Sequence, residues 1–549
     1  MTHDPRHDSA IHGDDGPAPW DDEHEDEGGA PAPNGIAAAN GADDLPVIKV
    51  FGGSLACNRR EAEAALALRG MHDPMRAIYQ RGGVLVRIHR IPQAGADRCG
   101  VERPAGTPSI VPCEPGFLRC HLAEVATWAK YDGRRKCDVA INPPPDVVPP
   151  LLAGPWKAIQ PLTGILETPA LLPDGSLLAG QGYHPTTGLL LDTITIPPIQ
   201  PSRTAAEAAL KILLEIYAGF PFVGEVDRAV ALATPLSGLQ AGVLDATPLI
   251  ASDAPTPGSG KTLLSEVAGY IATGRRPAAM TQASSEEEDK KRLLSVLLGG
   301  DQMALIDNIY RPLESDALCA ILTGAEYEDR ILGASRKVRL RSRMLWTATG
   351  NNLRIVGDLI RRSLGCRIDP RCERPDARAF DVDLHVEVPR RRTELVHAAL
   401  TIMASYAAAG RPHPLPPYGN FDSWSRMVRE PLAWLGMADP CDSRDALAGS
   451  DPETEALASL MDAWWRCFAD QPVLIKDVIT KTHTVTAETI ALRDAIANVA
   501  VERGGRGTLS QAIGFYLRSK LDRVHRGRCF ARGEGDKDAG AARWRLLEC

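Results

Sequence analysis

The most constraining stretch of the chain is a glycine-rich segment set between two apolar runs, 251-ASDAPTPGSGKTLLSEV-267. Its Gly-Lys-Thr at 260–262 completes the pattern G-x-x-x-x-G-K-[ST], which marks a loop whose N–H groups surround phosphates. Counting back from Lys261 places Pro255 where the pattern has its first glycine. Proline has a fixed φ and no N–H, so it cannot supply a left-handed turn there. Taken alone, the stretch fits either a nucleotide site or a glycine-rich turn before a helix.

Chain length and charge set the frame for this segment. A chain of 549 residues is expected to form two to four domains, and its 44% apolar and 24% charged content is typical of soluble globular proteins. The net charge of −8 is unevenly distributed, because residues 1–45 hold twelve acidic residues and one arginine. That tail is predicted to be disordered. The remaining chain is mildly basic, which is compatible with binding nucleic acid.

The cysteines and the apolar runs favour an intracellular protein without a membrane span. The twelve cysteines form no C-x-x-C pair, and polar residues stand where a secretory signal would have its apolar core. We therefore expect reduced thiols and a cytoplasmic location. A zinc site is one interpretation of Cys99, Cys113, Cys120 and His121, and incidental buried thiols are the other. No apolar run reaches the length of a membrane-spanning helix.

The order of strand and helix patterns predicts an α/β protein with several regions. Between 243 and 385 apolar strands alternate with helices, which predicts a parallel sheet with helices on both faces. The expected regions are a disordered tail (1–45), an α+β region of unknown role (46–150), a β and helical region (151–242), the core (243–385), a helical region (386–470) and a C-terminal region of helices and a basic hairpin (471–549).

The glycine-rich loop has the three parts that a phosphate site needs. A strand at 248–253 stops sharply, a flexible turn follows, and a helix begins at Lys261 with its positive end toward the loop. Lys261 would neutralise the β and γ phosphates, and the Thr262 hydroxyl would join the shell of a Mg²⁺ ion. The residues expected to contact nucleotide are Pro257, Gly258, Ser259, Gly260, Lys261, Thr262 and Leu263.

A second apolar strand, 303–307, ends at Asp307. A parallel strand beside the loop strand would place Asp307 at the same sheet edge, where it can hold Mg²⁺ together with Thr262. Asn308 follows where many ATPases have a glutamate that polarises the attacking water. Asparagine can orient water but is not a base, so the catalytic base is left open. An ordinary strand with a polar cap is the alternative.

A third strand ends at Asn351 and Asn352, and two arginines, Arg361 and Arg362, follow shortly after it. A polar amide at such a strand tip can position water beside a γ-phosphate, and a simple turn is the alternative. The arginines can act as fingers that stabilise transition-state charge in a neighbouring subunit, or form a solvated helix face.

These motifs, in this order, resemble those of the AAA+ ATPases. Within that group the chain is most similar to the superfamily 3 helicases and to the helicase portion of phage and mobile-element primase–helicases. The loop matches the family form at Pro257, Gly258, Gly260, Lys261 and Thr262 and departs from it at Pro255. The segment 182-GYHPTTGLLLD-192 is also similar to one that precedes the helicase core. The resemblance implies ATP and Mg²⁺ as cofactors and a hexameric ring that moves DNA. No acidic primase motif is found in 46–150.

Two basic segments are candidates for DNA contact. The stretch 328–343 resembles the family's pore hairpin, and its alternation places Arg336, Lys337 and Arg339 on one face. The stretch 508–548 resembles a winged-helix unit, a helix followed by a two-stranded basic wing. Its candidate phosphate contacts are Arg518, Lys520, Arg523 and Arg526. For 328–343 the alternative is an edge strand protected by its charges. For 508–548 the alternative is a module that binds protein partners.

The sequence therefore predicts an enzyme, an ATP-dependent DNA helicase or translocase of phage or mobile-element replication. It would bind single-stranded or forked DNA with weak sequence preference. The alternative is a DNA-binding replication or regulatory ATPase that uses ATP as a switch without unwinding. Pro255 and Asn308 favour that alternative.

Overall fold

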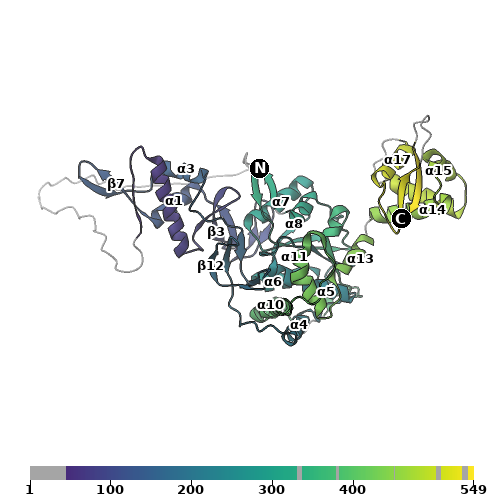
Figure 1. Cartoon of the computed structure of the whole chain (residues 1–549), viewed down its shortest axis with the longest axis horizontal. Helices are drawn as coiled ribbons and strands as arrows, with labels where there is room; N and C mark the ends of the chain where they lie inside the picture. Colours follow the sequence, from purple (N-terminus) through teal and green to yellow (C-terminus); the bar gives the residue numbers. More distant parts are fainter. Residues whose placement is uncertain are drawn as a thin grey trace, which may run out of the picture. The chain divides into compact units, whose positions relative to one another are not determined.

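The computed structural model describes residues 45–324, 326–330, 337–378, 382–449, 452–501, 508–533 and 542–549 (Figure 1). The chain divides between Leu45 and Pro46, and Pro46–Cys549 forms one unit of contacts. The predicted acidic tail up to residue 44 and the candidate DNA contact Arg336 lie outside the described residues.

A seven-stranded sheet carries the glycine-rich loop. Its strand order is β20-β14-β19-β16-β15-β5-β4. The first five strands run parallel, whereas β5 pairs antiparallel with β15 and β4 pairs antiparallel with β5. The strands are β4 (Gly95–Ala96), β5 (Glu102–Arg103), β14 (Leu249–Ala254), β15 (Ala278–Thr281), β16 (Met303–Ile309), β19 (Leu345–Asn351) and β20 (Ser363–Arg367). The predicted parallel strands are confirmed, but two strands from the N-terminal region make the whole sheet mixed.

Both faces of this sheet are covered by helices, as predicted. Successive strand residues point to opposite faces, and in β14 Ile250 joins one apolar core while Leu249 and Ala251 join another. The first core contains residues of α5 (Glu225–Gln240), α6 (Lys261–Thr273) and α10 (Arg392–Ala408). The second contains residues of α7 (Glu286–Gly299) and α8 (Asp316–Thr323).

The strand order corrects one detail of the sequence prediction. We expected the strand of Asp307 to lie beside the loop strand, but β19 pairs with both β14 and β16 and separates them. The order of strands in the sheet differs from their order along the chain, because β19, the third predicted strand, lies between β14 and β16. Asp307 still lies near the carboxyl end of its parallel strand, the edge at which the loop follows β14.

The N-terminal region contains two small sheets and three helices. The sheets have the orders β1-β7-β8 and β2-β3-β6, and the predicted hairpin turns at Gly82 and Gly83, which both have positive φ. The strands are β1 (Val47–Lys49), β2 (Ile78–Arg81), β3 (Val84–Arg90), β6 (Pro108–Pro112), β7 (Thr127–Asp132) and β8 (Cys137–Ala140). The helices are α1 (Leu55–His72), α2 (Pro115–Val125) and α3 (Val148–Ala153).

One glycine lies inside the last turn of a helix in this region. Helix α1 passes through Gly70 and continues to His72. A Cβ atom on Gly70 would lie 3.1 Å from Cβ of Ala77. The glycine therefore allows close packing here and does not act as a helix stop.

The linking region is rich in short strands, as predicted, and is followed by two helices. The elements are β9 (Gly164–Leu166), β10 (Ala170–Leu171), β11 (Leu177–Leu178), β12 (Gln181–His184), β13 (Leu189–Asp192) and α4 (Arg203–Tyr217), with α5 after them. Helices α4 and α10 pack together in the first core (Figure 1). The predicted helix at about 225–242 is thus largely buried beneath the sheet.

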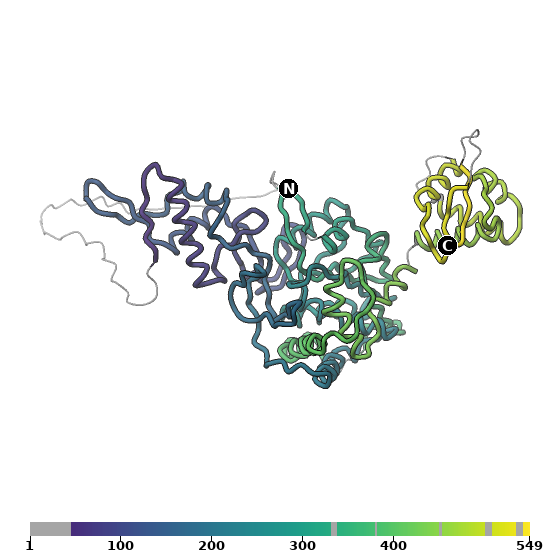
Figure 2. Tube along the Cα trace, in the orientation of Figure 1, coloured from purple at the N-terminus to yellow at the C-terminus, as the bar shows by residue number. Residues whose placement is uncertain are grey.

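The C-terminal residues, drawn in yellow in Figure 2, have an apolar core of their own. The predicted helix and antiparallel strand pair are present, and a third strand, which the sequence did not indicate, pairs with the last one to give the order β21-β23-β22. The elements are α14 (Pro452–Phe468), β21 (Val473–Leu474), α15 (Ile475–Lys481), α16 (Ala487–Val501), α17 (Leu509–Ser519), β22 (Arg528–Arg532) and β23 (Arg543–Glu548).

Two features are absent from the described residues. Within them, no helix combines the length and apolarity needed to cross a membrane. Nor do His, Cys, Asp and Glu side chains in this part of the chain form a group of three suited to a metal ion. Cys113 is buried, whereas Cys120 is exposed. The thiols considered for zinc therefore do not form such a site.

Candidate functional site

The loop between β14 and α6 depends on two glycines. Gly258 and Gly260 have φ of +71° and +99°, conformations that residues with a Cβ rarely adopt. The loop is also closed on itself, because the carbonyl oxygen of Thr256 accepts hydrogen bonds from Ser259 Oγ at 2.6 Å and from Lys261 Nζ at 3.1 Å. The turn is therefore built from 256–260, and Pro255 lies before it.

Lys261 joins the loop to the tip of β19. Its side chain is buried, and Nζ donates to Oδ1 of Asn351 at 2.7 Å. Burial lowers the pKa of the Lys261 ammonium, while the carboxylates of Asp253 and Asp307 raise it. A buried cation whose hydrogen-bond partners are a neutral amide and a backbone carbonyl is suited to receive an anion.

Thr262 and Asp307 meet at the same sheet edge. Thr262 Oγ1 donates to Oδ1 of Asp307 at 3.1 Å, and Thr349 Oγ1 donates to the same oxygen. Hydroxyl and carboxylate oxygens are the ligand types that Mg²⁺ prefers. This donor pair therefore fits the ion that the sequence analysis placed here, and Thr349 is a contributor that sequence reasoning missed.

Two asparagines, one near the end of β16 and one directly after β19, have backbone roles. Asn308 and Asn352 have φ of +55° and +48°, in the left-handed region that asparagine tolerates better than most residues. The Asn308 N–H donates to Thr349 Oγ1 at 3.3 Å, and the Asn352 N–H donates to the carbonyl oxygen of Ala254 at 3.0 Å. Of the predicted pair at 351 and 352, Asn351 is therefore the residue whose side chain contacts Lys261.

Asp253 ties the tip of β19 to the loop strand. Its Oδ1 accepts the Leu353 N–H at 2.7 Å, and its carboxylate pairs with Arg367 on β20. Neighbouring strands are thus linked by side chains at the edge that carries the loop. This contact holds the Asn351 segment in place beside Lys261.

Glu266 is a second acidic residue of the site that sequence reasoning missed. It lies one helical turn after Thr262 on α6, and its carboxylate is 3.1 Å from Arg276 Nε and 3.7 Å from His385 Nδ1. Burial raises the pKa of the Glu266 carboxyl, and the negative charge of Asp307 raises it further. The positive charges of Arg276 and His385 act in the opposite direction and lower it. The i, i+4 spacing from Thr262, which places both on one helix face, is the signal that could have found it.

The two predicted finger arginines lie at the opposite edge of the sheet. They end a short 3₁₀ segment, Gly357–Arg362, that precedes β20. Ser363 at the start of β20 pairs with Leu249 at the start of β14, whereas Lys261 follows the end of β14. The structure therefore does not bring Arg361 or Arg362 to the Lys261 of the same chain.

The two arginines differ in accessibility. The Arg361 side chain is 63% exposed, while that of Arg362 is 12% exposed. Both pair with Asp358, and the hydrogen bond from Arg361 is the largest cause that lowers the pKa of the Asp358 carboxyl to about 2. Arg361 is the arginine that can reach another molecule, and Arg362 supports the segment.

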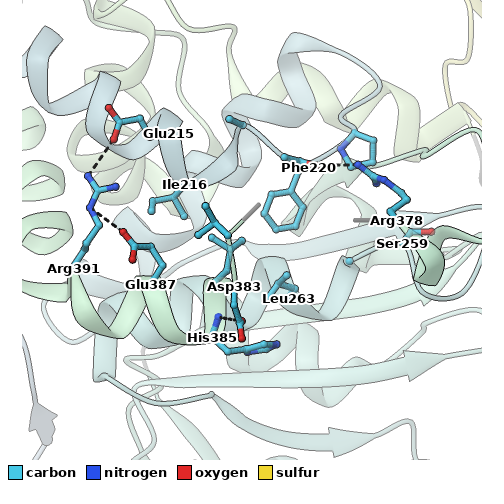
Figure 3. A pocket seen from close by; sticks show the side chains of 16 residues that line it. Glu215, Ile216, Phe220, Ser259, Leu263, Arg378, Asp383, His385, Glu387 and Arg391 are labelled. Carbon is cyan, nitrogen blue, oxygen red and sulfur yellow. Dashed lines mark hydrogen bonds and ion pairs between the residues drawn. The ribbon is translucent and has the colours of Figure 1, made fainter. Parts of the chain in front are cut away.

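A cavity of about 640 Å³ adjoins the loop (Figure 3). Ser259, Gly260 and Leu263 form one side of it, and the Phe220 ring projects into it from the segment after α4. On another side, Arg391 lies 3.2 Å from Glu215 and 4.0 Å from Glu387. A partly apolar, partly charged hollow beside a phosphate-type loop has the size and lining of a small-molecule site. No sequence motif indicates this cavity, because its walls come from segments that are distant along the chain.

The basic hairpin forms as predicted but carries compensating acids. Strands β17 (Tyr327–Arg330) and β18 (Lys337–Leu340) pair antiparallel, and in β18 exposed and buried residues alternate. Glu328 lies 2.8 Å from Lys337 and 3.1 Å from Arg339. The predicted face is therefore exposed, but its charge is partly neutralised.

The C-terminal basic residues divide into two groups. Arg518, Arg523 and Arg526 are exposed. Lys520 is instead 7% exposed and paired with Glu453, so the structure does not bring it to that surface. Residue spacing along the helix did not show that this lysine faces the core.

No protein-family model and no curated protein matches the chain. Among solved structures it is similar to the apo A form of the NrS-1 C-terminal region, with 8% identity and a TM-score of 0.38 over 88% of this chain and 98% of that one. It is also similar to SCCmec type IV Cch, an active helicase, with 10% identity and a TM-score of 0.29 over 86% of this chain and 97% of that one. A third similarity is to the JCV helicase, with 12% identity and a TM-score of 0.21 over 45% of this chain and 72% of that one. At these scores, functional inference rests on the geometry of the site.

Proposed function

We propose that the chain is an ATP-hydrolysing DNA motor of the AAA+ type, resembling superfamily 3 helicases of phages and mobile elements. The observation that carries the proposal is the convergence of Lys261, Thr262 and Asp307, with Asn351, at one edge of three parallel strands. A buried cation, a hydroxyl–carboxylate pair and a polar amide are the groups that phosphoryl transfer from ATP requires.

Each residue has a role that follows from its position. The N–H groups of 258–262 and Lys261 would hold the phosphates, and Thr262 and Asp307 would hold Mg²⁺, which supplies charge neutralisation when bound. Asn351 would orient the attacking water, because its amide is already beside Lys261. The cavity beside Phe220 and Leu263 would take the nucleoside.

DNA binding and assembly complete the proposal. The exposed face of β18 and the C-terminal region, which we interpret as a winged-helix unit, would contact phosphates through Lys337, Arg339, Arg518, Arg523 and Arg526. Arg361 lies too far along the sheet to serve its own site. The proposal therefore places it against the nucleotide of a neighbouring copy in a ring.

The test is ATP hydrolysis with and without single-stranded DNA, for the wild type and for Lys261→Ala. We expect DNA-stimulated hydrolysis in the wild type and a loss of at least about 100-fold in the variant, since the lysine stabilises transition-state charge. Lys211→Ala, on α4, is a matched control. Absence of hydrolysis by the wild type under both conditions would refute the proposal.

The alternative is an ATP-dependent switch that binds DNA without unwinding it. Asn308, whose backbone is left-handed, favours this alternative. Its side-chain amide cannot act as a base. A forked-duplex assay separates the two functions. Strand separation supports the motor, whereas ATP and DNA binding without separation supports the switch.

A further inference from the structure

The sheet β1-β7-β8 has one covered face and one open face. Ile48 and Trp128 belong to the apolar core shared with α1 and α2. Lys49 pairs with Ala129, and Tyr131 pairs with Asp138. Directly paired residues share a face and every second residue returns to it. Lys49 and Tyr131 therefore both lie on the face opposite to the core.

Large apolar groups are exposed on and beside this face. The exposed fraction is 60% for Tyr131, 58% for Val47 and 55% for Phe51, which follows β1 directly. Aromatic rings are usually buried because they carry a large apolar area. Two exposed rings at one small sheet indicate a surface that binds something flat and apolar.

Cations surround these rings. They are Lys49, Lys130, Arg134, Arg135 and Lys136, and all are exposed. Lys49 lies on the open face and Arg134–Lys136 follow β7, whereas Lys130, next to Tyr131 on β7, points to the other face. Asp138 pairs with Lys49 at 2.8 Å, and Asp132 lies 3.8 Å from Arg135. Within the described part of the chain, the other three cations form no ion pair. The surface thus has an excess of positive charge beside its aromatic groups.

A hollow of about 500 Å³ lies at the carboxyl end of β1. Phe51, Lys130, Asn142 and Asp146 line it, with Gly52 and Gly53. It therefore combines a ring, a cation, a carboxylate and hydrogen-bonding groups in one concave place. The loop after β1, the start of α1 and the segment after β8 form its walls, and Lys130 is contributed by β7 (labelled in Figure 1).

We propose that this face is a binding surface for single-stranded nucleic acid. Unpaired bases stack on Tyr131 and Phe51, and phosphates contact the turn residues Arg134–Lys136. Stacking on aromatic side chains combined with a cationic surface is the usual chemistry of single-strand binding, and it tolerates any base sequence. Duplex DNA cannot use the rings, because its bases are already stacked. This surface is separate from the ATPase site and works without ATP.

The first experiment measures binding of a fluorescent oligothymidine to the full chain by anisotropy, without nucleotide. We expect Tyr131→Ala to weaken binding by about fivefold or more, as expected for the loss of one stacked base. Tyr131→Phe retains the ring and should bind like the wild type. Met71→Ala, which removes another exposed apolar side chain of this region, is the matched control. Wild-type affinity in Tyr131→Ala would overturn the proposal, as would an equal loss for duplex DNA.

The second experiment locates the contact directly. An oligonucleotide containing 5-iododeoxyuridine is photocrosslinked to the full chain, and the crosslinked peptides are identified by mass spectrometry. We expect crosslinks at Tyr131 or Phe51. Crosslinks confined to 337–341 and 508–533 would overturn the proposal. So would a change in particle mass in Tyr131→Ala with unchanged DNA binding, because the face would then bind a second copy.

The charges are tested separately. The double variant Arg134→Glu/Arg135→Glu should lower the affinity and reduce its dependence on salt, because fewer counterions are released on binding. Arg60→Glu, an exposed cation on α1, is the control. An unchanged salt dependence in the double variant would contradict the proposed phosphate contacts. Lys261→Ala should retain the Tyr131 crosslink, so failure of the proposed ATPase function and failure of this surface give different results.

Discussion

At the residue scale, the site is a set of short contacts between side chains that lie near the carboxyl ends of three parallel strands. Lys261 binds Asn351, Thr262 binds Asp307, and Thr349 supports the same carboxylate. Each of these contacts joins groups that the chain separates by many residues. The contacts hold the groups ready, so that binding of ATP would require little rearrangement of the backbone.

Asp307→Asn tests the proposed metal role. Asparagine keeps the shape of the side chain but removes the negative charge that a divalent cation needs. We expect hydrolysis to fall by at least about 100-fold, with binding of a fluorescent ATP analogue largely retained.

A coupled ATPase assay and an anisotropy titration measure the two quantities for Asp307→Asn. Asp245→Asn, an exposed carboxylate before β14, is the control. Hydrolysis by Asp307→Asn at the wild-type rate would exclude Asp307 from the mechanism.

At the element scale, strands β4 and β5 join the N-terminal region to the seven-stranded sheet. Arg103 on β5 is buried, and its guanidinium lies 2.8 Å from Asp301 and 2.7 Å from Asp97. Burial acts to lower the pKa of Arg103, but these two carboxylates raise it overall. The arginine therefore stays charged and fastens β5 to the segment that precedes β16.

Arg103→Ala should destabilise the protein, because it leaves buried carboxylates without their partner. A loss of about 3–5 kcal/mol in the free energy of unfolding is expected from removing one member of a buried pair. Urea denaturation measures it, and Arg98→Ala, an exposed arginine nearby, should change little. Equal stability of the two variants would contradict the anchoring role.

The β17–β18 hairpin carries a prediction about DNA affinity. Glu328 neutralises Lys337 and Arg339, and these two residues lower the pKa of its carboxyl. Glu328→Gln removes a competing charge, so Lys337 becomes available to phosphates, whereas Arg339 keeps its second partner, Glu326, at 3.4 Å. Affinity for single-stranded DNA should rise, and its salt dependence should become steeper by about one counterion.

Anisotropy titrations at several salt concentrations measure the effect of Glu328→Gln. Glu114→Gln, an exposed carboxylate of the N-terminal region, is the control. If Glu328→Gln and Glu114→Gln change the affinity equally, the effect is one of net charge and the hairpin contact is wrong.

At the scale of the whole molecule, the role proposed for Arg361 requires more than one copy. The residue lies at the sheet edge opposite to Lys261, so under this proposal a complete site would need a neighbour's arginine. Inactive Lys261→Ala and inactive Arg361→Ala should therefore regain part of their hydrolysis when mixed, because some interfaces then combine intact groups.

The ATPase rate of the mixture, and the particle mass with a non-hydrolysable ATP analogue, test this. Arg371→Ala is a control for loss of an arginine elsewhere in the chain. Mixtures that stay inactive while forming mixed particles would contradict the shared site.

Much of the local structure could be predicted from the sequence. Hydrophobic periodicity identifies β14, β16 and β19, and the Gly-Lys-Thr pattern identifies the loop and the start of α6. These features depend on neighbouring residues alone. Lys261, Thr262, Asp307 and Asn351 could be selected for the same reason, since each stands at a predicted strand or helix end.

Other features could not be predicted, because they depend on which segments pack together. Glu266, Thr349 and the cavity beside Phe220 have no motif, and their surroundings come from distant segments. The burial of Lys520 and the ion pairs of Glu328 could not be predicted either, because both depend on residues that are distant along the chain or on a paired strand.

The glycine-rich loop illustrates both parts. The sequence by itself determined that a turn with two left-handed glycines precedes a helix that begins at Lys261, because only glycine adopts those angles without strain. Only the tertiary structure decided that β19 enters between β14 and β16. That order places Asn351 beside Lys261 and leaves Arg361 at the far edge, because parallel strands bring all their carboxyl ends to one side of the sheet.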